Sequence, residues 1–218
     1  MSKKKKTFVT PVVECRYPFL DKPDTRYNKE GVYRIQLVFD KDHDFIDKVN
    51  KASLQEFEKA KRHMKPDDAV KVQFHSPVAI LYDADGNDTG KVEIQFKSNA
   101  TYTDRVTGDK KQIKVNMFDA KGKPLTIIPR VGNGSKVSVA FSVKPQVVTG
   151  KFYYTMYLNA LQLIELIEFQ PDGSSYGFGK HDEGFDSESF FEETENKESF
   201  DTGSDQSTTI ADDDDAPF

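Results

Sequence analysis

The side chains of greatest chemical interest are lysines and aromatic rings that recur on one side of several strand-like segments. They are Lys97, Lys114, Phe118, Lys136, Tyr153 and Tyr157. Lysines can follow the phosphates of a polynucleotide, while exposed rings stack on unpaired bases at about 1–3 kcal/mol per base with little regard to sequence. The pattern therefore predicts a surface that binds single-stranded nucleic acid. No helix–turn–helix, zinc finger or basic zipper is visible for reading a duplex groove.

Four segments must position these side chains, and each alternates apolar and polar residues with the period of a half-buried strand. They are residues 91–102, 112–119, 136–144 and 152–160. The apolar sets expected to point inward are Val92, Ile94 and Phe96; Ile113, Val115 and Met117; Val137, Val139, Phe141 and Val143; and Phe152, Tyr154, Met156, Leu158 and Ala160. The cations and rings then share the opposite face.

Three further strands are predicted in the first part of the chain. Residues 7–20 form the first, residues 31–40 the second, and residues 69–82 a third that Pro77 interrupts. Arg34, near the start of the second strand, joins the candidate nucleic-acid contacts. Residues 83–90 are dense in Asp, Asn and Gly and predict a hairpin connection, because the glycine and glutamate positions of a calcium-binding EF-hand loop are not matched.

Residues 43–64 change to helical spacing. The apolar residues Phe45, Ile46, Val49, Ala52 and Phe57 fall on one side of an amphipathic helix. Acidic residues gather in its first turn and basic residues in its last turn, which complements the helix dipole. We expect this helix to cap one end of a sheet or barrel, with Pro66 preventing much continuation.

Catalysis is not expected, so we assign no catalytic residue, no metal ligand and no cofactor. The four histidines are His43, His63, His75 and His181, and none has a partner at metal-ligand spacing. The dense carboxylates, Asp83 with Asp85 and the run 212–215, lie in segments expected to be too mobile for a preorganised two-metal site.

Charge divides the 218-residue chain. Residues 171–218 carry fifteen Asp and Glu against two Lys, a net charge of −13, which leaves 21 acids and 29 bases, a net charge of +8, in residues 1–170. We predict a flexible basic arm at 1–6, a nucleic-acid-binding domain at 7–170 and a disordered acidic tail at 171–218.

The tail ends in a compact docking tip. Four aspartates, Asp212, Asp213, Asp214 and Asp215, precede Ala-Pro and the terminal Phe218. The ring can enter an apolar pocket, the α-carboxylate can meet a basic rim, and the aspartates can steer the approach. We expect this tip to bind partner proteins.

The lone cysteine, Cys15, excludes an intramolecular disulfide and favours a reducing compartment. Residues 7–20 are broken by prolines and charges and do not make a signal peptide. No stretch approaches the roughly 20 apolar residues that cross a bilayer. We therefore expect an intracellular protein without membrane contact.

The chain resembles phage single-stranded DNA-binding proteins of the replication type. The similarity runs from the Lys-rich start through Lys22-Pro23, Gly31-Val-Tyr-Arg34 and the following helix to the stretch 127–136, which ends Gly-Asn-Gly-Ser-Lys. It continues through Leu163-Ile-Glu-Leu166 into the acidic tail. The tip also resembles the ending of bacterial single-stranded DNA-binding proteins.

This resemblance implies a mostly β fold, an OB-fold five-stranded barrel with one main helix. It implies coating of exposed DNA strands in phage replication, recombination and repair, strand annealing, and tail contacts with DNA polymerase and helicase–primase. It further implies a homodimer and a location in the host cytoplasm. By position, Lys97 and Tyr102 match DNA-contacting residues of the family, and Phe218 matches its terminal aromatic residue.

Two other functions are compatible with the residues. One is a single-stranded RNA-binding OB or cold-shock-like module, which would use the 2′-hydroxyl. The other is an adaptor that binds only proteins through its tail. If the chain binds DNA, we expect the tail, with its net charge of −13, to compete with DNA for residues 1–170, which have a net charge of +8.

Overall fold

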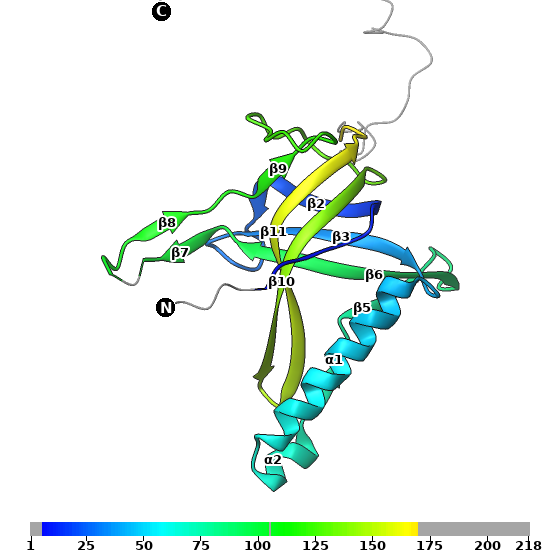
Figure 1. Cartoon of the computed structure of the whole chain (residues 1–218), viewed down its shortest axis with the longest axis vertical. Helices are drawn as coiled ribbons and strands as arrows, with labels where there is room; N and C mark the ends of the chain where they lie inside the picture. Colours follow the sequence, from blue (N-terminus) through cyan, green and yellow to red (C-terminus); the bar gives the residue numbers. More distant parts are fainter. Residues whose placement is uncertain (1–5, 105, 170–218) are drawn as a thin grey trace, which may run out of the picture. The chain divides into compact units, whose positions relative to one another are not determined.

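The computed structural model describes residues 6–104 and 106–169, which fold mainly into β-strands with one long helix, α1 (Figure 1). The elements in chain order are β1 (Phe8–Val9), β2 (Val13–Asp24), β3 (Val32–Asp40), α1 (Asp44–Arg62), α2 (Pro66–Lys71), β4 (Gln73–His75), β5 (Val78–Tyr82), β6 (Asp88–Asn99), β7 (Thr101–Thr103), β8 (Lys110–Gln112), β9 (Asn116–Phe118), β10 (Lys136–Val148) and β11 (Lys151–Glu165).

Five long strands close into a barrel. β2 pairs with β3, β3 with β6, β6 with β11 in parallel, β11 with β10, and β10 with β2. Closure removes the free edges that an open sheet of these strands would have. The predicted five-stranded OB-type barrel with one main helix is therefore confirmed.

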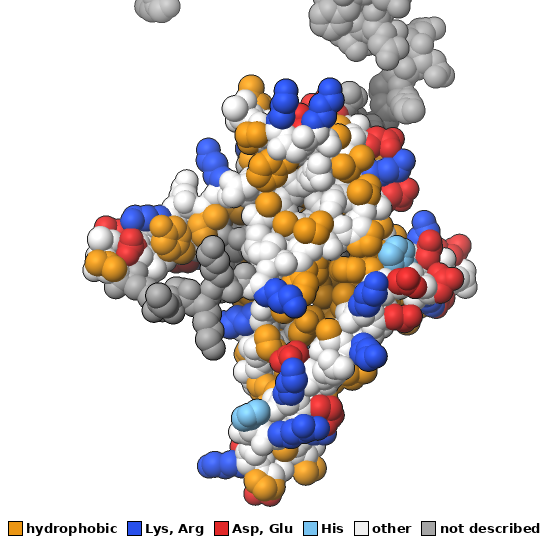
Figure 2. Space-filling view, in the orientation of Figure 1, with side chains coloured by type: hydrophobic (Ala, Val, Ile, Leu, Met, Phe, Trp, Pro, Cys, Tyr) orange, Lys and Arg blue, Asp and Glu red, His pale blue; other side chains and the backbone are white. Residues whose placement is uncertain are grey.

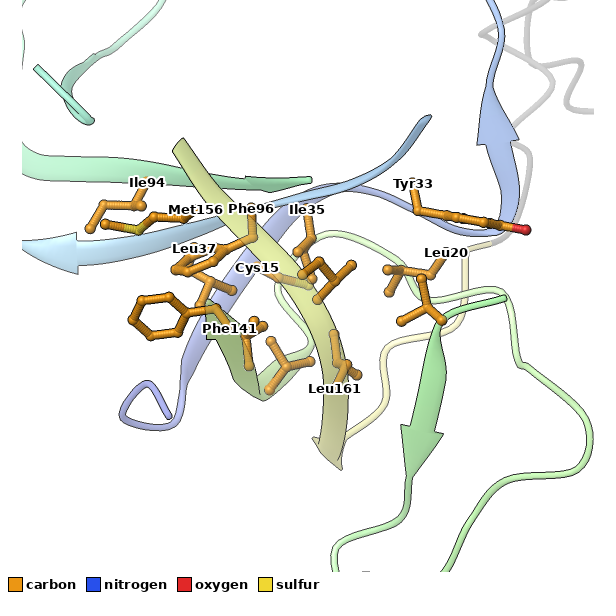
Figure 3. Close-up of a cluster of buried hydrophobic side chains, with 14 of the residues drawn as sticks. Cys15, Leu20, Tyr33, Ile35, Leu37, Ile94, Phe96, Phe141, Met156 and Leu161 are labelled. Atoms are coloured by element: carbon orange, nitrogen blue, oxygen red, sulfur yellow. The ribbon is translucent and has the colours of Figure 1, made fainter. Parts of the chain in front are cut away.

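Side chains from all five strands fill the barrel interior, and among them Ile94, Phe96, Phe141 and Met156 were predicted to point inward. Ile35, Leu37, Ile94 and Phe96 are fully buried on β3 and β6. In Figure 3 they meet Cys15, Leu20, Phe141, Met156 and Leu161, which come from β2, β10 and β11. The opposite faces of these strands are consequently turned toward solvent.

Helix α1 packs beside the barrel and along the long β10–β11 hairpin (Figure 1). The ring of Phe45 stacks on Phe39 of β3 with 5.2 Å between centroids, and Phe57 lies 5.2 Å from Phe152 of β11. His43 caps the helix, since its Nδ1 accepts the Phe45 amide at 3.0 Å. Figure 2 shows a hydrophobic hollow between this helix and the central strands, bordered by Lys or Arg.

Two expected strands are partly wrong. The segment 112–119 is not one strand, because its two ends pair with different partners: β8 ends at Gln112 and pairs with β7, whereas β9 spans Asn116–Phe118 and pairs with β11. Residues 69–71 belong to α2 and not to a strand, because Pro66 at the first helical turn presets a helical φ and Asp67 and Asp68 stabilise the helix N-terminus. Pro77 does separate β4 from β5, as predicted. The 83–90 connection is confirmed as a hairpin turn, in which the Asp83 amide donates to the Asn87 carbonyl at 2.9 Å.

Alternation also shifts near the middle of β11. Ala140 pairs with Ala160 and Phe141 with Leu158, so Asn159 is an extra residue in a β-bulge. Beyond it the buried positions are Leu161 and Leu163 instead of the expected Ala160. No helix within residues 6–104 and 106–169 is long and apolar enough to cross a bilayer.

Candidate nucleic-acid interface

Four strands place two cations and two rings in one row across the outer face of the barrel. Phe19 of β2 is paired with Arg34 of β3, Arg34 with Lys97 of β6, and Lys97 with Tyr157 of β11. With neighbouring strands about 4.8 Å apart, the row is about 14 Å long. We call these four residues the cation–ring row. Three of them, Arg34, Lys97 and Tyr157, were predicted contacts.

Arg34 is held in place on the barrel by a carboxylate and a ring. Its Nη2 donates to Asp24 Oδ2 at 2.8 Å, and its guanidinium lies 4.7 Å from the centre of the Phe19 ring. Arg26 reaches the same ring at 5.2 Å and also binds Asp24. The hydrogen bonds from Arg26, with the charge of Arg34, lower the pKa of Asp24 to about 2. Asp24 is therefore ionised and fixes the Arg34 side chain at the surface.

Lys97 differs from Arg34, because its side chain is exposed and forms no ion pair within residues 6–104 and 106–169. Beside Lys97 lies a depression of about 320 Å³, which is lined by Lys97, Gln95, His75 and Tyr153 among others. Tyr153 stands against His75 with 4.9 Å between ring centroids. Thus the predicted Tyr153 adjoins the row at its β11 end.

The other predicted residues of the described chain lie apart from this row. Tyr102 is 47% exposed on β7, opposite Lys111 in the small β7–β8 hairpin that projects in Figure 1. Lys114 is exposed and Phe118 half-buried, and both line a hollow of about 380 Å³ beside β9. These residues belong to separate surfaces. An extended ligand would contact them only if it reached beyond the cation–ring row.

Lys136 has a local partner. Its Nζ donates to Glu165 Oε2 at 2.6 Å, which raises the pKa of Lys136, and its other cross-strand neighbour is Glu14. The two carboxylates offset the positive charge of Lys136. The predicted docking residues Asp212, Asp213, Asp214, Asp215 and Phe218, the rest of the tail and residues 1–5 of the arm lie outside the described residues.

Sequence reasoning missed a second group of rings and cations next to Phe19. A groove of about 590 Å³ is lined by Tyr17, Phe19, Arg26, Arg130 and Phe169 among others. Tyr17 and Phe169 are 50% and 53% exposed, and Arg130 lies 5.9 Å from the Phe169 ring. The Arg16-Tyr-Pro-Phe19 run was the available signal, but the irregular register between Arg16 and Phe19 breaks the alternation that would have revealed it.

The turn at residues 132–135 builds one wall of this groove. Asn133 Oδ1 accepts the Tyr17 amide at 2.7 Å, and the Ile167 amide donates to Ser135 Oγ at 3.0 Å. Gly132 is required there, since an added Cβ would lie 2.9 Å from the Ile167 carbonyl oxygen. The turn thereby joins β2 to the segment that leads into the acidic tail.

Within the described residues, no cluster of three or more His, Cys, Asp or Glu side chains could hold a metal ion. What the outer face offers is charge, rings and hydrogen-bond donors in fixed positions. This arrangement suits binding of an extended, anionic ligand with flat groups.

Comparison with known proteins agrees with this chemistry. A family model described as "Single-stranded DNA-binding protein, Bacteriophage T7" matches residues 13–166. The single-stranded DNA-binding protein of Enterobacteria phage T3 is 27% identical over 177 residues, covering 72% of this chain and 74% of its own length. That of Escherichia phage T7 is 27% identical over 180 residues, covering 70% and 72%.

The fold is also similar to a solved structure. The crystal structure of gp2.5, a single-stranded DNA-binding protein encoded by bacteriophage T7, superposes with a TM-score of 0.63. The match covers 84% of this chain and 99% of that one at 22% sequence identity. At this identity the likeness concerns the fold alone.

Proposed function

Since this chain belongs to the family of single-stranded DNA-binding proteins of the bacteriophage T7 type, we propose that it binds single-stranded DNA through the cation–ring row. The family is defined by binding and not by catalysis, in keeping with the sequence-based prediction that the chain is not an enzyme. The observation that carries the proposal is the register that aligns Phe19, Arg34, Lys97 and Tyr157 across four strands.

The row suits an unpaired strand better than a duplex. Its cations lie in the middle and its rings at the ends, so phosphates can approach Lys97 and Arg34 while bases turn toward Phe19 and Tyr157. Stacking requires unpaired bases and favours no base in particular, because every base has a π-face. The groove beside Tyr17 and Phe169 and the depression beside Tyr153 would lengthen the track at its two ends.

Arg34 and Arg26 already form ion pairs with Asp24, so the cations on this face do not contribute equally to DNA binding. Arg34 and Arg26 share that carboxylate at 2.8 Å and 3.0 Å, and their role is chiefly to orient the Phe19 ring. Lys97 is the exposed cation of the row and is the one best placed to neutralise a phosphate. Replacing counterions in this way is the main source of affinity for nucleic acid without sequence preference.

We infer the biological setting from the resemblance to this family. The protein coats exposed DNA during phage replication, recombination and repair and supports annealing of strands, in the host cytoplasm. Residues 7–170 bind DNA, and residues 171–218 recruit DNA polymerase and helicase–primase through Asp212–215 and Phe218. A homodimer forms through the tail. Support for these finer roles comes from the acidic sequence that ends in phenylalanine.

The tail also regulates access to DNA. The tail has a net charge of −13 and residues 1–170 have a net charge of +8. In the absence of DNA, the tail is therefore attracted to the same cations that DNA would contact. DNA displaces the tail, and the displaced tip becomes available to partners. Weak anionic ligands are thereby excluded from the binding face.

The first experiment is binding of a labelled oligothymidine strand to the full-length protein, measured by fluorescence anisotropy. We expect saturable binding whose logarithmic salt slope is about −0.7 per phosphate neutralised. If the protein did not bind the strand, the remaining hypothesis would be an adaptor that binds only proteins through its tail. A competitor RNA of matched sequence that displaced the DNA strand at lower concentration than DNA itself would support the RNA-binding alternative instead.

The residue test compares Lys97→Ala with Lys59→Ala on α1. Both lysines are exposed, so each change removes one surface charge. The proposal requires that Lys97→Ala weakens binding and reduces the salt slope, whereas Lys59→Ala leaves both unchanged. Equal effects of the two substitutions would mean that only overall charge matters and that the row is not the site.

A further inference from the structure

Tyr17 on β2 adopts a backbone conformation that its residue type disfavours. Its φ is 46°, in the left-handed region, where the Cβ of a bulky L-residue is crowded. Thr149 is the other non-glycine residue with positive φ in residues 6–104 and 106–169. It occupies the two-residue loop between Val148 and Lys151, where hairpin turns require positive φ. Tyr17 lies within a strand, so no hairpin loop accounts for its conformation.

The unusual backbone turns the Tyr17 ring out of the barrel. Cys15 is fully buried, and residue 17 of a regular strand would point to the same interior face. Between its pairs with Gln36 and Arg34 of β3, however, β2 contains one extra residue, which makes a β-bulge. Leu20 takes the next buried position of β2, and Figure 3 shows it in the core with Cys15. The Tyr17 side chain is consequently 50% exposed.

The exposed Tyr17 ring lines the groove of about 590 Å³ that also contains the rings of Phe19 and Phe169. Arg16 Nη2 donates to Tyr17 Oη at 3.1 Å, and the Arg16 guanidinium lies 4.9 Å from the centre of the Tyr17 ring. These contacts fix the orientation of the ring and place a positive charge beside it. A fixed, half-exposed ring next to a cation is suited to stack on an unpaired base that carries a phosphate.

A side chain of the turn that walls this groove holds the Tyr17 backbone. The backbone of the turn pairs with both polar groups of Cys15. The Cys15 amide donates to the Ser135 carbonyl at 2.9 Å, and the Gly134 amide donates to the Cys15 carbonyl at 2.8 Å. At Tyr17 a side chain takes over, since Asn133 Oδ1 accepts the Tyr17 amide at 2.7 Å. Asn133 therefore supplies the acceptor at the residue where β2 departs from a regular strand.

We propose that Asn133 is a positioning residue for DNA binding. It holds Tyr17 in the left-handed conformation, so that the Tyr17 ring stacks on one unpaired base in the groove. The inference rests on the proposed function and adds to it a stacking residue and its support, both outside the cation–ring row. A bulky side chain in this region lowers stability, and such conformations are concentrated at sites where function uses them.

The strained conformation can be tested without DNA by comparing glycine with alanine. At an ordinary strand position glycine is less stable than alanine, whereas at a left-handed position glycine is the better tolerated residue. Tyr17→Gly should therefore have a higher urea midpoint than Tyr17→Ala. The matched control is the exposed Gln95 of β6, where Gln95→Gly should have a lower midpoint than Gln95→Ala. The control order at both positions would show that Tyr17 is not strained and would overturn the proposal.

Stacking can be observed directly because the chain has no tryptophan. Tyr17→Trp introduces one fluorophore at the groove and keeps a ring, so the variant should bind oligothymidine as tightly as wild type. Stacking on a base should quench its fluorescence, and addition of Asn133→Ala should reduce the quenching at saturating DNA. The control is Tyr82→Trp on β5, 57% exposed and outside the groove, which should not be quenched. Unchanged Tyr17→Trp fluorescence on DNA binding would overturn the proposal.

A double-mutant cycle tests whether Asn133 acts through Tyr17. Loss of the ring in Tyr17→Ala should raise the dissociation constant for oligothymidine roughly 5- to 150-fold. Asn133→Ala alone should also weaken binding, because the ring is no longer held in place. The double variant should bind as tightly as Tyr17→Ala alone, because Asn133 then has no ring left to position. Additive effects of the two substitutions would overturn the positioning role of Asn133.

The wild-type protein separates this inference from the proposed function. If wild type did not bind oligothymidine, the proposed function would fail and this inference would fail with it. If wild type bound and Lys97→Ala weakened binding, whereas Tyr17→Ala bound as wild type, the cation–ring row would stand and the Tyr17 stacking site would be wrong.

Discussion

Arg34 on β3 and Lys97 on β6 are directly paired across the antiparallel ladder, so two positive side chains lie side by side on the outer face of the barrel. Like charges in this arrangement are destabilising, and cross-strand charge pairs change stability by about 0.2–1 kcal/mol. Asp24 offsets the charge of Arg34 alone. The remaining repulsion is expected where a surface must attract an anionic ligand.

Replacing Lys97 by glutamate should therefore separate stability from binding. A glutamate opposite Arg34 forms an attractive cross-strand pair, so the urea midpoint of Lys97→Glu should be equal to or higher than that of wild type. Affinity for oligothymidine should fall at the same time, because a phosphate contact is replaced by repulsion. Urea unfolding and anisotropy measure the two effects. A variant that lost both stability and binding would indicate that Lys97 is mainly structural.

Tyr157→Ala should weaken DNA binding through loss of stacking. One stacked base contributes about 1–3 kcal/mol, so the dissociation constant should rise roughly 5- to 150-fold while the salt slope stays the same. Tyr157→Phe keeps the ring and should bind nearly as wild type. If Tyr157→Phe were as weak as Tyr157→Ala, the hydroxyl and not the ring would be the group in contact.

Deletion of residues 171–218 should tighten DNA binding, most strongly at low salt, because the competing charge of −13 is removed. The same deletion should abolish capture of replication proteins by immobilised protein. A full-length variant with the tail Asp and Glu changed to Asn and Gln serves as the length control. Equal DNA affinity of deleted and intact chains would exclude autoinhibition by the tail.

Asp24→Asn should destabilise the protein in a pH-dependent way. The pKa of Asp24 is lowered from its usual 3.8 to about 2, so its ionised form stabilises the fold. That contribution is fully present above about pH 4 and is lost as the pH falls through 2. The difference in urea midpoint between wild type and Asp24→Asn should therefore be largest at pH 6 and shrink toward pH 2. A difference that is constant with pH would mean that Asp24 acts through packing.

Cys15 should be inert in the folded protein. The thiol is fully buried, and burial raises its pKa to about 12, so almost none of the protein carries the reactive thiolate at pH 8. A thiol reagent should label Cys15 slowly in buffer and promptly in strong urea, with the absorbance of the released chromophore as readout. Prompt labelling in buffer would show that β2 opens readily.

Much of the fold could be predicted because its signals are local. Alternation identified Val92, Ile94 and Phe96 as buried and left Lys97 on the opposite face, as the structure shows. Helical spacing and terminal charges predicted α1. The errors were also local in origin. The first helix ends before Pro66, as expected, but Pro66 also begins α2, so residues 69–71 are helical instead of extended, and the bulge at Asn159 reversed the phase of β11.

The binding surface could not be assembled from such signals. Its predicted members Arg34, Lys97, Tyr153 and Tyr157 were found because each is a cation or ring on a strand. Phe19 was missed because the irregular register after Arg16 hides its orientation. Lys136 has the same residue type as Lys97, but only the structure places Glu165 2.6 Å from it.

By itself, the sequence determined the strand periods, the long helix, the division of charge and the family, because all of these depend on residue type and short-range order. Tertiary structure decided which residues became neighbours. Phe19, Arg34, Lys97 and Tyr157 come from four separate strands, and the closure of one barrel sets their mutual register. A shift of one residue in any strand would turn its member of the row inward, and no local pattern in a single strand can specify its alignment with the others.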